Sequence, residues 1–471
     1  MTTKPDIIAS LVQQTFDSLP AKRKPVIRDN GLREWVPLSG IVAEDKDGKL
    51  TCLSLATGMK CLPSSRLPTA RGNVLHDWHA EVLAIRAFNC FVLDECRALA
   101  SDSAVSSDFL RHRSRAEIAA AGDGPGDGAS WHGQPFAWRE DVLLHMYCSE
   151  APCGDASMEL TMASQADATP WAVPGMPAPL QEISEPPPAD ALLPGRAYFS
   201  QLGIVRRKPS RGDAPPTLSK SCSDKLSLRQ CTSLLSSLAS LLVSPAHAYV
   251  STLVLPASQH SASGCRRAFS GGSSEAEASA QQARMAPLVS ARDASVGGYA
   301  FRPFEVRTTD REFAFSRRRP ARAASPAPSN PAAEGDPARA VRLTPSNLAA
   351  ALAASGREET TLNGVLQGRR AAEADARGAS FASRRRMWAL AVEVAGLLGG
   401  EDGACIRRAL GATVTTTTTT TTTSASAPAG VTYGDVKGTA LLGPRWRAKD
   451  AARRLALKGW VRNSGDEDFV L

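Results

Sequence analysis

The stretch LHDWHAEV, Leu75–Val82, opens a strongly periodic segment of this 471-residue chain. It leads into WHAEVLAIRAFNCFVLDE, residues 78–95, whose apolar residues recur at helical spacing and predict a buried helix. His79 and Glu81 would lie on its first turn. Catalytic zinc sites need three protein ligands, an open position for water and a carboxylate near that water. H-x-E supplies one ligand and one carboxylate, but so short a match is common by chance and also fits a solvated polar turn.

A second candidate ligand follows a predicted strand. DVLLHMYCS, residues 141–149, is apolar and bounded by charge and a turn, which predicts a short buried strand. In the following EAPCGDAS, residues 150–157, Pro152-Cys153 opens a helix, whose N-terminus favours a thiolate. The nucleobase deaminase signature is H-x-E followed by P-C-x-x-C. Its last cysteine is replaced here by Ala156, so one ligand is missing.

Two other cysteines could supply this ligand. Cys222 lies in KSCSDKLSL, among polar and charged residues, and is the first candidate. Cys148 ends the predicted strand and is the reserve. Cys90 and Cys96 lie on the apolar helix and are expected in the core. The ten cysteines lack the spacing of a disulfide scaffold, which favours free or metal-bound thiols in a reducing compartment.

The three motifs HAE, PCGDAS and SCSDK, in this order, resemble the adenosine deaminase (editase) domain. That domain is shared by adenosine deaminases acting on double-stranded RNA and by tRNA-specific adenosine deaminases, and its second cysteine ligand comes from SCSDK. The resemblance extends to five further stretches: ATGMKC (56–61), RKPSRGDAPPTLS (207–219), GYAFRPFEVRTT (298–309), NGVLQGRR (363–370) and GWVRN (459–463). SCSDKLSLRQ and KPSRGD are most similar to a fungal member of the tRNA-specific branch.

The resemblance implies a fold and a reaction. The fold would be α/β, with a cytidine-deaminase-like zinc core of mixed sheet and helices, elaborated into one large editase domain. His79, Cys153 and Cys222 would bind Zn²⁺, and Glu81 would carry protons while water attacks C6 of adenine, ammonia leaves and inosine remains. The substrate would be adenosine at position 37 of tRNA, next to the anticodon.

The same family holds inositol hexakisphosphate in its core, so the resemblance also implies a polyphosphate site. The matching positions are Asp77, Arg86, Lys225, Tyr433, Lys437 and Trp460, with Arg369 and Arg462 aligned less securely. Asp77 and Lys225 would form a relay between the metal and the polyphosphate. The family's Ala-Arg-Trp after SCSDK is replaced by Ser227, Leu228 and Arg229, a departure within this site.

Basic residues in loops that match substrate-side segments of the family are the candidate RNA contacts: Lys60, Arg206, Arg207, Lys208 and Arg211. The net charge of +8 suits a polyanionic partner, here the anticodon stem-loop of tRNA, although arginine-rich composition alone would also produce it.

Structured and compositionally biased segments alternate along the chain. An N-terminal helical segment, residues 1–49, is expected to pack on an editase domain of residues 50–471. Low-complexity insertions, expected to be disordered, lie near 101–134, 164–194, 257–283, 317–340 and 412–430. Residues 248–255 read as a strand, residues 301–309 and 311–316 as short strands or turns, and the leucines of 234–242 as one helical face.

Other function classes remain open at this level. An enzyme editing double-stranded RNA or mRNA would carry separate binding modules, for which the residues before the catalytic region are too few. A cytidine or free-nucleoside deaminase would use P-C-x-x-C, and a non-catalytic RNA-binding zinc protein would not need Glu81. We expect no secretory signal and no membrane span, a cytoplasmic or nuclear location, and a monomer, although the sequence leaves the oligomeric state open.

Overall fold

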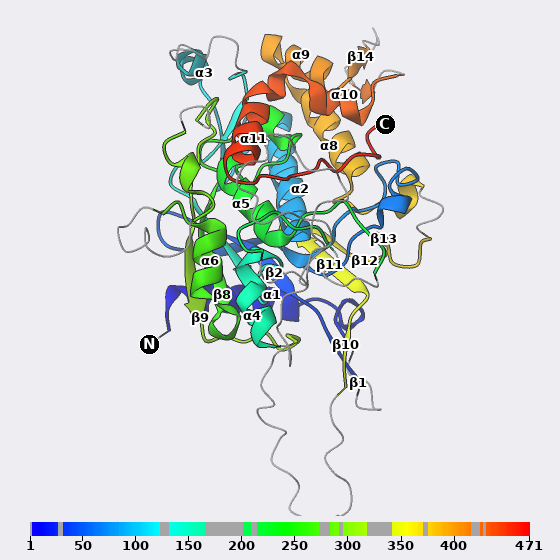
Figure 1. Cartoon of the computed structure of the whole chain (residues 1–471). Helices are drawn as coiled ribbons and strands as arrows, with labels where there is room; N and C mark the ends of the chain where they lie inside the picture. Colours follow the sequence, from blue (N-terminus) through cyan, green and yellow to red (C-terminus); the bar gives the residue numbers. More distant parts are fainter. Residues whose placement is uncertain are drawn as a thin grey trace, which may run out of the picture.

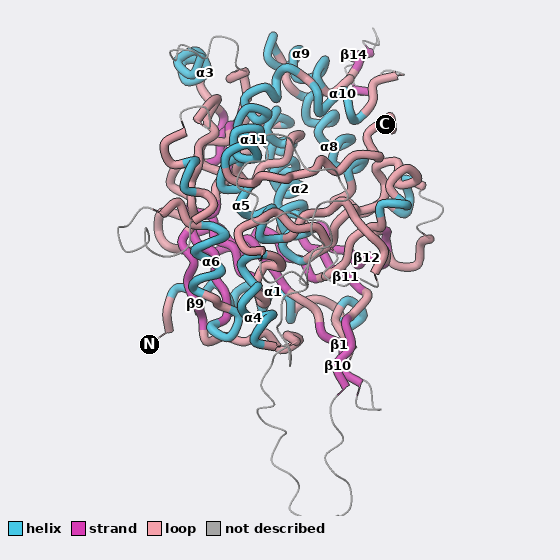
Figure 2. The backbone as a smooth tube through the Cα atoms, in the orientation of Figure 1, coloured by secondary structure: helices cyan, strands magenta, loops and turns pink. Residues whose placement is uncertain are grey.

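The computed structural model describes residues 2–26, 32–122, 131–164, 201–208, 214–272, 283–291, 295–317, 342–370, 375–415, 424–426 and 430–471. Its centre is an eight-stranded mixed sheet with the order β13-β12-β11-β3-β2-β6-β8-β9 (Figures 1 and 2). In that order the strands are Val365–Leu366, Arg357–Leu362, Leu348–Ala353, Leu50–Thr57, Leu38–Glu44, Leu143–Cys148, Val250–Pro256 and Glu305–Thr309. This mixed α/β architecture is the one expected from the sequence.

The sheet joins distant parts of the chain. The strands from β13 to β6 pair antiparallel, whereas β6, β8 and β9 run parallel. The parallel strands β6 and β8 are the predicted strands of residues 141–149 and 248–255. Since the sheet takes strands from residues 38 to 366, the segments on either side of the first four biased stretches belong to one sheet.

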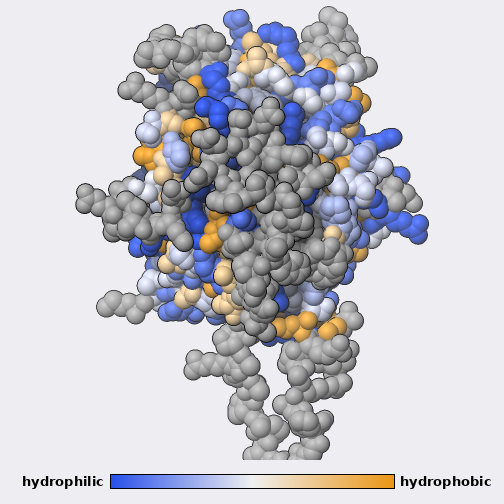
Figure 3. Space-filling model, in the orientation of Figure 1, coloured by the Kyte–Doolittle hydropathy of each residue, from blue (hydrophilic) through white to orange (hydrophobic). Residues whose placement is uncertain are grey.

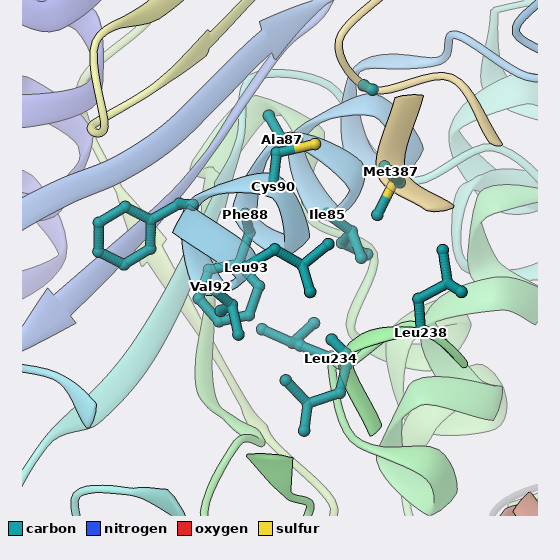
Figure 4. Close-up of a cluster of buried hydrophobic side chains, with 14 of the residues drawn as sticks. Ile85, Ala87, Phe88, Cys90, Val92, Leu93, Leu234, Leu238 and Met387 are labelled. Atoms are coloured by element: carbon teal, nitrogen blue, oxygen red, sulfur yellow. The ribbon is translucent and has the colours of Figure 1, made fainter. Parts of the chain in front are cut away.

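Helix α2, Ala80–Ser101, covers one face of the sheet and is the predicted helix of residues 78–95. Fifteen of its 22 residues are buried, including residues on every side of the helix, because the sheet covers one side and other segments cover the opposite side. Figure 4 shows Ile85, Phe88 and Leu93 of this helix packed with Leu234 and Met387 from two later segments.

Helix α1, Lys4–Asp17, lies on the opposite face (Figure 1). Thr3 and Asp6 form a capping box at its start, and its apolar face packs on β2, β6 and β8. Phe16 makes an edge-on contact with Phe313, the ring centroids being 5.0 Å apart. Helix α1 thus packs on the sheet, and residue 49, the expected boundary, lies in the turn between β2 and β3. β2 is a central strand of the sheet, so residues 1–49 are not a purely helical segment.

The other helices cover the α2 side or the edges of the sheet. They are α3 Arg115–Gly122, α4 Met158–Ala163, α5 Cys222–Thr232, α6 Ala262–Phe269, α8 Arg384–Leu397, α9 Gly400–Ala409, α10 Tyr433–Gly438 and α11 Gly443–Leu455. Three small sheets complete the described elements: β1 Leu32–Trp35 with β10 Arg342–Pro345; β4 Leu110–His112 with β5 Phe136–Trp138 and β7 Val243–Ser244; and β14 Thr413–Thr415 with β15 Ser424–Ser426.

One expectation about local structure was wrong. The leucines of residues 234–242 do not form an α-helix, because Ser233 adopts a φ of +55° directly after α5 and ends it. The segment continues as an irregular chain with a short 3₁₀ turn, and its leucines are buried nonetheless. Residues 311–316, expected as a short strand or a turn, form a turn.

The expected insertions are only partly irregular. The first contains β4 and α3, and the third contains α6, whose Phe269 is buried in the core. Small residues made these segments resemble low-complexity sequence, yet tertiary contacts give them a defined structure. Most of 164–194 and 317–340, and the centre of 412–430, lie outside the described residues.

On the face shown in Figure 3, the described surface has hydrophilic residues with small, separate hydrophobic areas between them. None of the described helices has the length and apolar character needed to cross a membrane. All ten cysteines fall within the described residues, and all are free thiols.

The C-terminal tail is hydrogen-bonded to the loop before α2. Asp466 accepts a hydrogen bond from the backbone N–H of Gly72, at 2.8 Å, and lies 2.7 Å from His76 Nε2. Phe469 stacks on Tyr433 with the ring centroids 5.1 Å apart. Although Asp466 is close, burial and the nearby Arg384 guanidinium lower the pKa of His76 to about 4, so the imidazole is neutral at pH 7.

This pKa predicts how stability depends on pH. The unfolded chain binds a proton at His76 below its ordinary pKa of 6.5, whereas the native protein does not until about pH 4. The free energy of unfolding should therefore fall as the pH drops from about 6.5 to about 4, by up to about 3 kcal/mol from this residue. Chemical denaturation at several pH values should show a flatter profile for His76→Gln. The exposed His112→Gln serves as control, and a profile for His76→Gln as steep as wild type would contradict the assignment.

Candidate metal centre and active site

His79 is the N-cap residue of α2, and backbone contacts on both sides of it hold the chain there. The N–H of Trp78 donates to the carbonyl of Lys60 at 3.0 Å, and the N–H of Ala80 donates to the carbonyl of Gly58 at 2.9 Å. Gly58 has a φ of +138°, and a Cβ there would lie 2.1 Å from the Trp78 carbonyl oxygen. Glycine is therefore required for the ATGMKC segment to approach the His79 backbone.

Cys153 lies in the loop that follows β6. Gly154, with a φ of +107°, turns the chain directly after it into a 3₁₀ turn and α4. A Cβ at Gly154 would lie 2.3 Å from Ser221 Oγ, so the loop packs against the start of α5 without space for a side chain.

Cys222 is the first residue of α5, whose N-cap is Ser221. Its N–H donates to Cys153 Sγ at 3.3 Å. The next residue, Ser223, donates its N–H to the Cys153 carbonyl at 3.0 Å and its hydroxyl to the Pro152 carbonyl at 2.9 Å. The two cysteine segments, far apart in sequence, thus interlock along their backbones.

These contacts bring His79, Cys153 and Cys222 together. One ligand atom from each lies within 4.8 Å of the others, and Cys153 Sγ is 3.9 Å from His79 Nδ1. An imidazole and two thiols are a donor set that suits Zn²⁺ with a further position open. Ala156, which holds the last position of P-C-x-x-C, is buried and contributes no ligand. The reserve candidate Cys148 is buried and is not one of the possible metal ligands found among the described residues.

The charges of this site are strongly coupled. Hydrogen bonding to Cys222 and the nearby Lys208 and His79 hold the pKa of Cys153 well below its usual range. Burial and the Cys153 charge raise the pKa of Cys222. A divalent cation bound here would require both thiols to be deprotonated, so metal binding must release protons.

Glu81 lies in the first turn of α2, two residues beyond His79, and is 6% exposed. Burial, together with the Cys153 charge, raises the pKa of its carboxyl. The buried carboxylate of Asp77 is bonded to lysines, whereas within the described part of the chain no lysine or arginine forms an ion pair with Glu81. A buried carboxyl beside a metal centre can accept and return a proton.

Lys208 differs from the role expected for it. It was expected to contact RNA, but it is 4% exposed and donates to Asp77 Oδ2 at 2.9 Å and to Cys222 Sγ at 3.2 Å. Asp77 also accepts from Ser219 at 2.5 Å and from Lys225. Burial alone would raise the pKa of Asp77, but Lys208 and Lys225 hold it well below its usual range. The expected Asp77–Lys225 contact is present, and Lys208 extends it to a cysteine ligand.

The other candidate RNA contacts differ in their exposure to solvent. Arg206 is 1% exposed and is a second correction, because its backbone and side chain bond inside the protein. Lys60 and Arg207 are partly exposed. Arg211 lies outside the described residues. The sequence could not separate these residues, since a loop of basic residues reads the same whether it faces inward or outward.

A large cluster of cations lies where the polyphosphate site was expected. Its members come from α2, α5, α8, α10, α11 and the segment before α5, and most of them depress one another's pKa: Arg86, Lys220, Lys225, Arg229, Arg384, Lys437, Arg445, Lys449 and Arg453. Burial and the Lys225 charge lower the pKa of Lys220 to about 7. Burial and Arg445 lower the pKa of Arg229 to about 9. The Nε atoms of Arg445 and Arg453 are buried without a hydrogen-bond partner among the described residues.

Aromatic residues line this cation cluster. Lys437 lies 5.8 Å from the Tyr433 ring centroid, and Lys220 and Arg453 lie 5.7 and 5.5 Å from that of Trp460. Arg462 is exposed and lies over Trp446, outside the buried part. Arg369 is also exposed, and its side chain lies beside Gly378. Neither of these two less secure positions is therefore among the buried cations.

The spacing of three basic residues on α11 is a sequence pattern that indicates the cation cluster. Arg445, Lys449 and Arg453 recur every fourth residue on α11, so their like charges share one helix face and repel. Such a face needs a polyanion or several acids opposite it. On α5, Arg229 lies one helical turn after Lys225 and is adjacent to Leu228, which stands where the family has an arginine.

The close packing of Gly154 predicts a selective effect on metal binding. Gly154→Ala should separate the Cys153 loop from α5 and weaken metal binding as well as folding. Gly356→Ala is the matched control, because Gly356 also has a positive φ, of +86°, but nothing lies within 4 Å of the position that an added methyl group would occupy. The control should lose about 1–2 kcal/mol of stability and keep its metal. Metal content by mass spectrometry and thermal unfolding would test this, and equal metal content in both variants would contradict it.

The comparisons with known proteins agree with this geometry. The adenosine-deaminase (editase) domain family matches residues 54–294. The tRNA-specific adenosine deaminase 1 of Schizosaccharomyces pombe is 38% identical over 314 residues, which are 66% of this chain and 70% of that protein. That of Saccharomyces cerevisiae is 35% identical over 49% of this chain and 53% of its own length. The double-stranded RNA-specific adenosine deaminase of Mus musculus is 26% identical over 32% of this chain and 11% of its own. The chain therefore belongs to the adenosine-deaminase (editase) domain family.

Proposed function

We propose that this protein is a zinc-dependent enzyme that hydrolyses adenosine to inosine in tRNA, at position 37 beside the anticodon. The observation that carries the proposal is the convergence of His79, Cys153 and Cys222 within 4.8 Å, beside the buried carboxyl of Glu81. A structural zinc site would be closed by a fourth protein ligand, whereas a catalytic one keeps a position open. Glu81 would have no function in a non-catalytic zinc protein.

Each residue of the site would have a separate role in the reaction. When bound, Zn²⁺ supplies a water of lowered pKa, and hence a nucleophile at neutral pH. Glu81 would carry one proton from the water to the purine, and a second proton from the hydroxyl added at C6 to the amino group that leaves as ammonia. Lys208, between Asp77 and Cys222, stabilises the negative charge of the thiolate ligand. The interlocked backbones of Cys153 and Ser223 keep the two thiols at a fixed separation.

The tRNA substrate is supported by the extent of the likeness. The two yeast relatives named as tRNA-specific match about half to two thirds of this chain, whereas the relative named as double-stranded RNA-specific matches about one third. Lys60 and Arg207 are the partly exposed cations of the substrate-side segments and are the proposed contacts to the anticodon stem-loop. The proposed location is the cytoplasm, the nucleus or both, where tRNA is available.

The cation cluster supports a bound polyphosphate. Several buried cations that depress one another's pKa destabilise a fold unless a polyanion neutralises them. Inositol hexakisphosphate carries high negative charge and many hydrogen-bond acceptors. It would accept from the buried Nε atoms of Arg445 and Arg453, which have no acceptor among the described residues. Arg86, Lys225, Tyr433, Lys437 and Trp460 would hold it together with Lys220, Arg229 and Lys449. Asp77 and Lys225 would connect this ligand to the metal centre.

The catalytic assignment predicts the behaviour of Glu81→Gln. The variant should fold and retain zinc, because Glu81 is not a ligand, but inosine formation should fall by about 10²–10⁴-fold or more. The assay uses a tRNA transcript with adenosine 3′ of the anticodon, with inosine read by sequencing. Glu359→Gln, at another carboxyl whose pKa is raised by burial, is the matched control and should remain active. Unchanged inosine formation by Glu81→Gln would refute the proton-carrying role.

The same assay distinguishes the substrates. Transcripts with adenosine only at the wobble position and a long double-stranded RNA serve as comparisons. Editing only at the wobble position would refute the proposed specificity while keeping the chemistry, and editing only of the duplex would favour the alternative class of editing enzyme.

The polyphosphate proposal predicts a ligand released on denaturation. Mass spectrometry of the supernatant of acid-denatured wild-type protein should detect inositol hexakisphosphate. Lys449→Met should lower its amount and the melting temperature, because Lys449 is half-buried among cations. Arg454→Met, on the same helix but exposed, should lower neither. Wild-type protein that releases no polyphosphate would contradict the proposal.

A further inference from the structure

A group of buried charged residues lies directly behind the two cysteine ligands and has no part in the chemistry described above. Both ligand motifs read Cys-x-Asp, with Asp155 two residues after Cys153 and Asp224 two residues after Cys222. Both aspartates have no exposed surface. Asp155 is bonded to Arg267 and Asp224 to Arg284, and both arginines are buried and come from later in the chain.

Asp155 joins the Cys153 loop to α6. Arg267 Nε lies 3.1 and 3.0 Å from the two carboxylate oxygens of Asp155, and another nitrogen of the same guanidinium donates to the Asp155 carbonyl at 2.9 Å. The remaining nitrogen donates to Glu159 at 2.6 Å. Figure 1 shows α6 beside α4, the helix that follows this loop. Asp155 Oδ1 also accepts the N–H of Gly203 at 2.9 Å.

Asp224 joins the start of α5 to the same part of the chain. Its Oδ1 accepts from Arg284 at 2.6 Å, and its Oδ2 accepts from the Ser221 hydroxyl at 2.6 Å and from the Arg206 N–H at 2.9 Å. In an ordinary capping box this carboxylate would bond to the N–H of the N-cap residue. The N–H of Ser221 instead donates to the Arg206 carbonyl, so the carboxylate can fix the helix start to Arg284.

The two arginines are themselves connected. The N–H of Arg284 donates to the Arg267 carbonyl at 3.2 Å, and Arg284 Nε donates to the Ala268 carbonyl at 3.1 Å. Arg284 also donates to Ser227 Oγ at 2.8 Å. A continuous set of bonds thus runs from the Cys153 loop through α6 and Arg284 to the N-terminal turns of α5.

We propose that the pairs Arg267–Asp155 and Arg284–Asp224 are positioning devices that set the separation and direction of the two thiolate ligands. Buried ion pairs are on average no more stabilising than apolar residues of the same size, so stability alone does not account for two of them here. Groups that orient metal ligands from behind affect metal affinity and activity by about 10–100-fold. The inference rests on the proposed metal site, since it assigns residues that arrange its ligands.

The test uses double variants, which remove a pair without leaving one charge buried alone. Asp224→Asn/Arg284→Gln should bind zinc about 10–100-fold more weakly in competition with a chromophoric chelator. The cobalt-substituted form should show shifted visible absorption bands, which report the geometry of the metal's ligands. The matched control is Asp94→Asn/Arg357→Gln, which removes the Asp94–Arg357 ion pair at 2.6 Å between α2 and β12. It should lower the melting temperature by a similar amount and leave the zinc affinity and the cobalt spectrum unchanged.

The outcomes separate this inference from the function on which it rests. Zinc affinity of Asp224→Asn/Arg284→Gln within about threefold of wild type, or an equal loss in the control, would overturn the positioning role alone. Wild-type protein that binds neither metal would overturn the proposed site as well. If the double variant does not fold, Arg284→Lys keeps the charge but cannot bond Asp224, Ser227 and Ala268 together, and is expected to show an intermediate loss of affinity. Wild-type affinity and spectrum in Arg284→Lys would then overturn the inference.

Discussion

The contact on which the active site depends is the backbone packing of the Cys153 loop against the first turn of α5. The position that a side chain at Gly154 would occupy is already filled, and Ser223 donates hydrogen bonds to the carbonyls of Pro152 and Cys153. Because these are main-chain contacts at close range, they bring together two thiols that come from segments far apart in sequence. His79 needs only to be presented at the N-terminus of α2 for the ligand set to be complete.

The environment of the site is unusually rich in buried charge. Asp77 is surrounded by Lys208, Lys225 and Ser219, and the buried carboxylates of Asp155 and Asp224, each two residues after a cysteine, are paired with arginines. In a low-dielectric interior such groups are stable only when every charge has a partner. Glu81 is the exception, since its carboxyl is buried next to the ligands and pairs with no lysine or arginine in the described segments. That contrast distinguishes the proposed proton carrier from the residues proposed to maintain the arrangement.

The cation cluster extends the same principle beyond the metal centre. Its members come from five helices and from the segment before α5, and their charges oppose the close packing of α5 and α11. A polyanion between these helices would turn that repulsion into attraction, so ligand and fold would be interdependent. The Asp77–Lys225 contact places the edge of this cluster directly behind the metal ligands.

The sequence by itself determined several local elements and the three side chains that converge at the candidate metal centre. The period of residues 78–95 predicts α2, the apolar runs predict β6 and β8, and the three ordered motifs predict which side chains meet, because local pattern and ligand chemistry are properties of short segments. Tertiary structure alone decided the direction in which loop residues face. Lys208 and Arg206 are buried behind Cys222 and not exposed to RNA, Ser233 ends α5 before the leucines of 234–242, and β2 lies in the middle of the sheet. The physical reason is that burial depends on partners from distant segments, such as Asp77 for Lys208 and Asp224 for Arg206, which no local pattern contains.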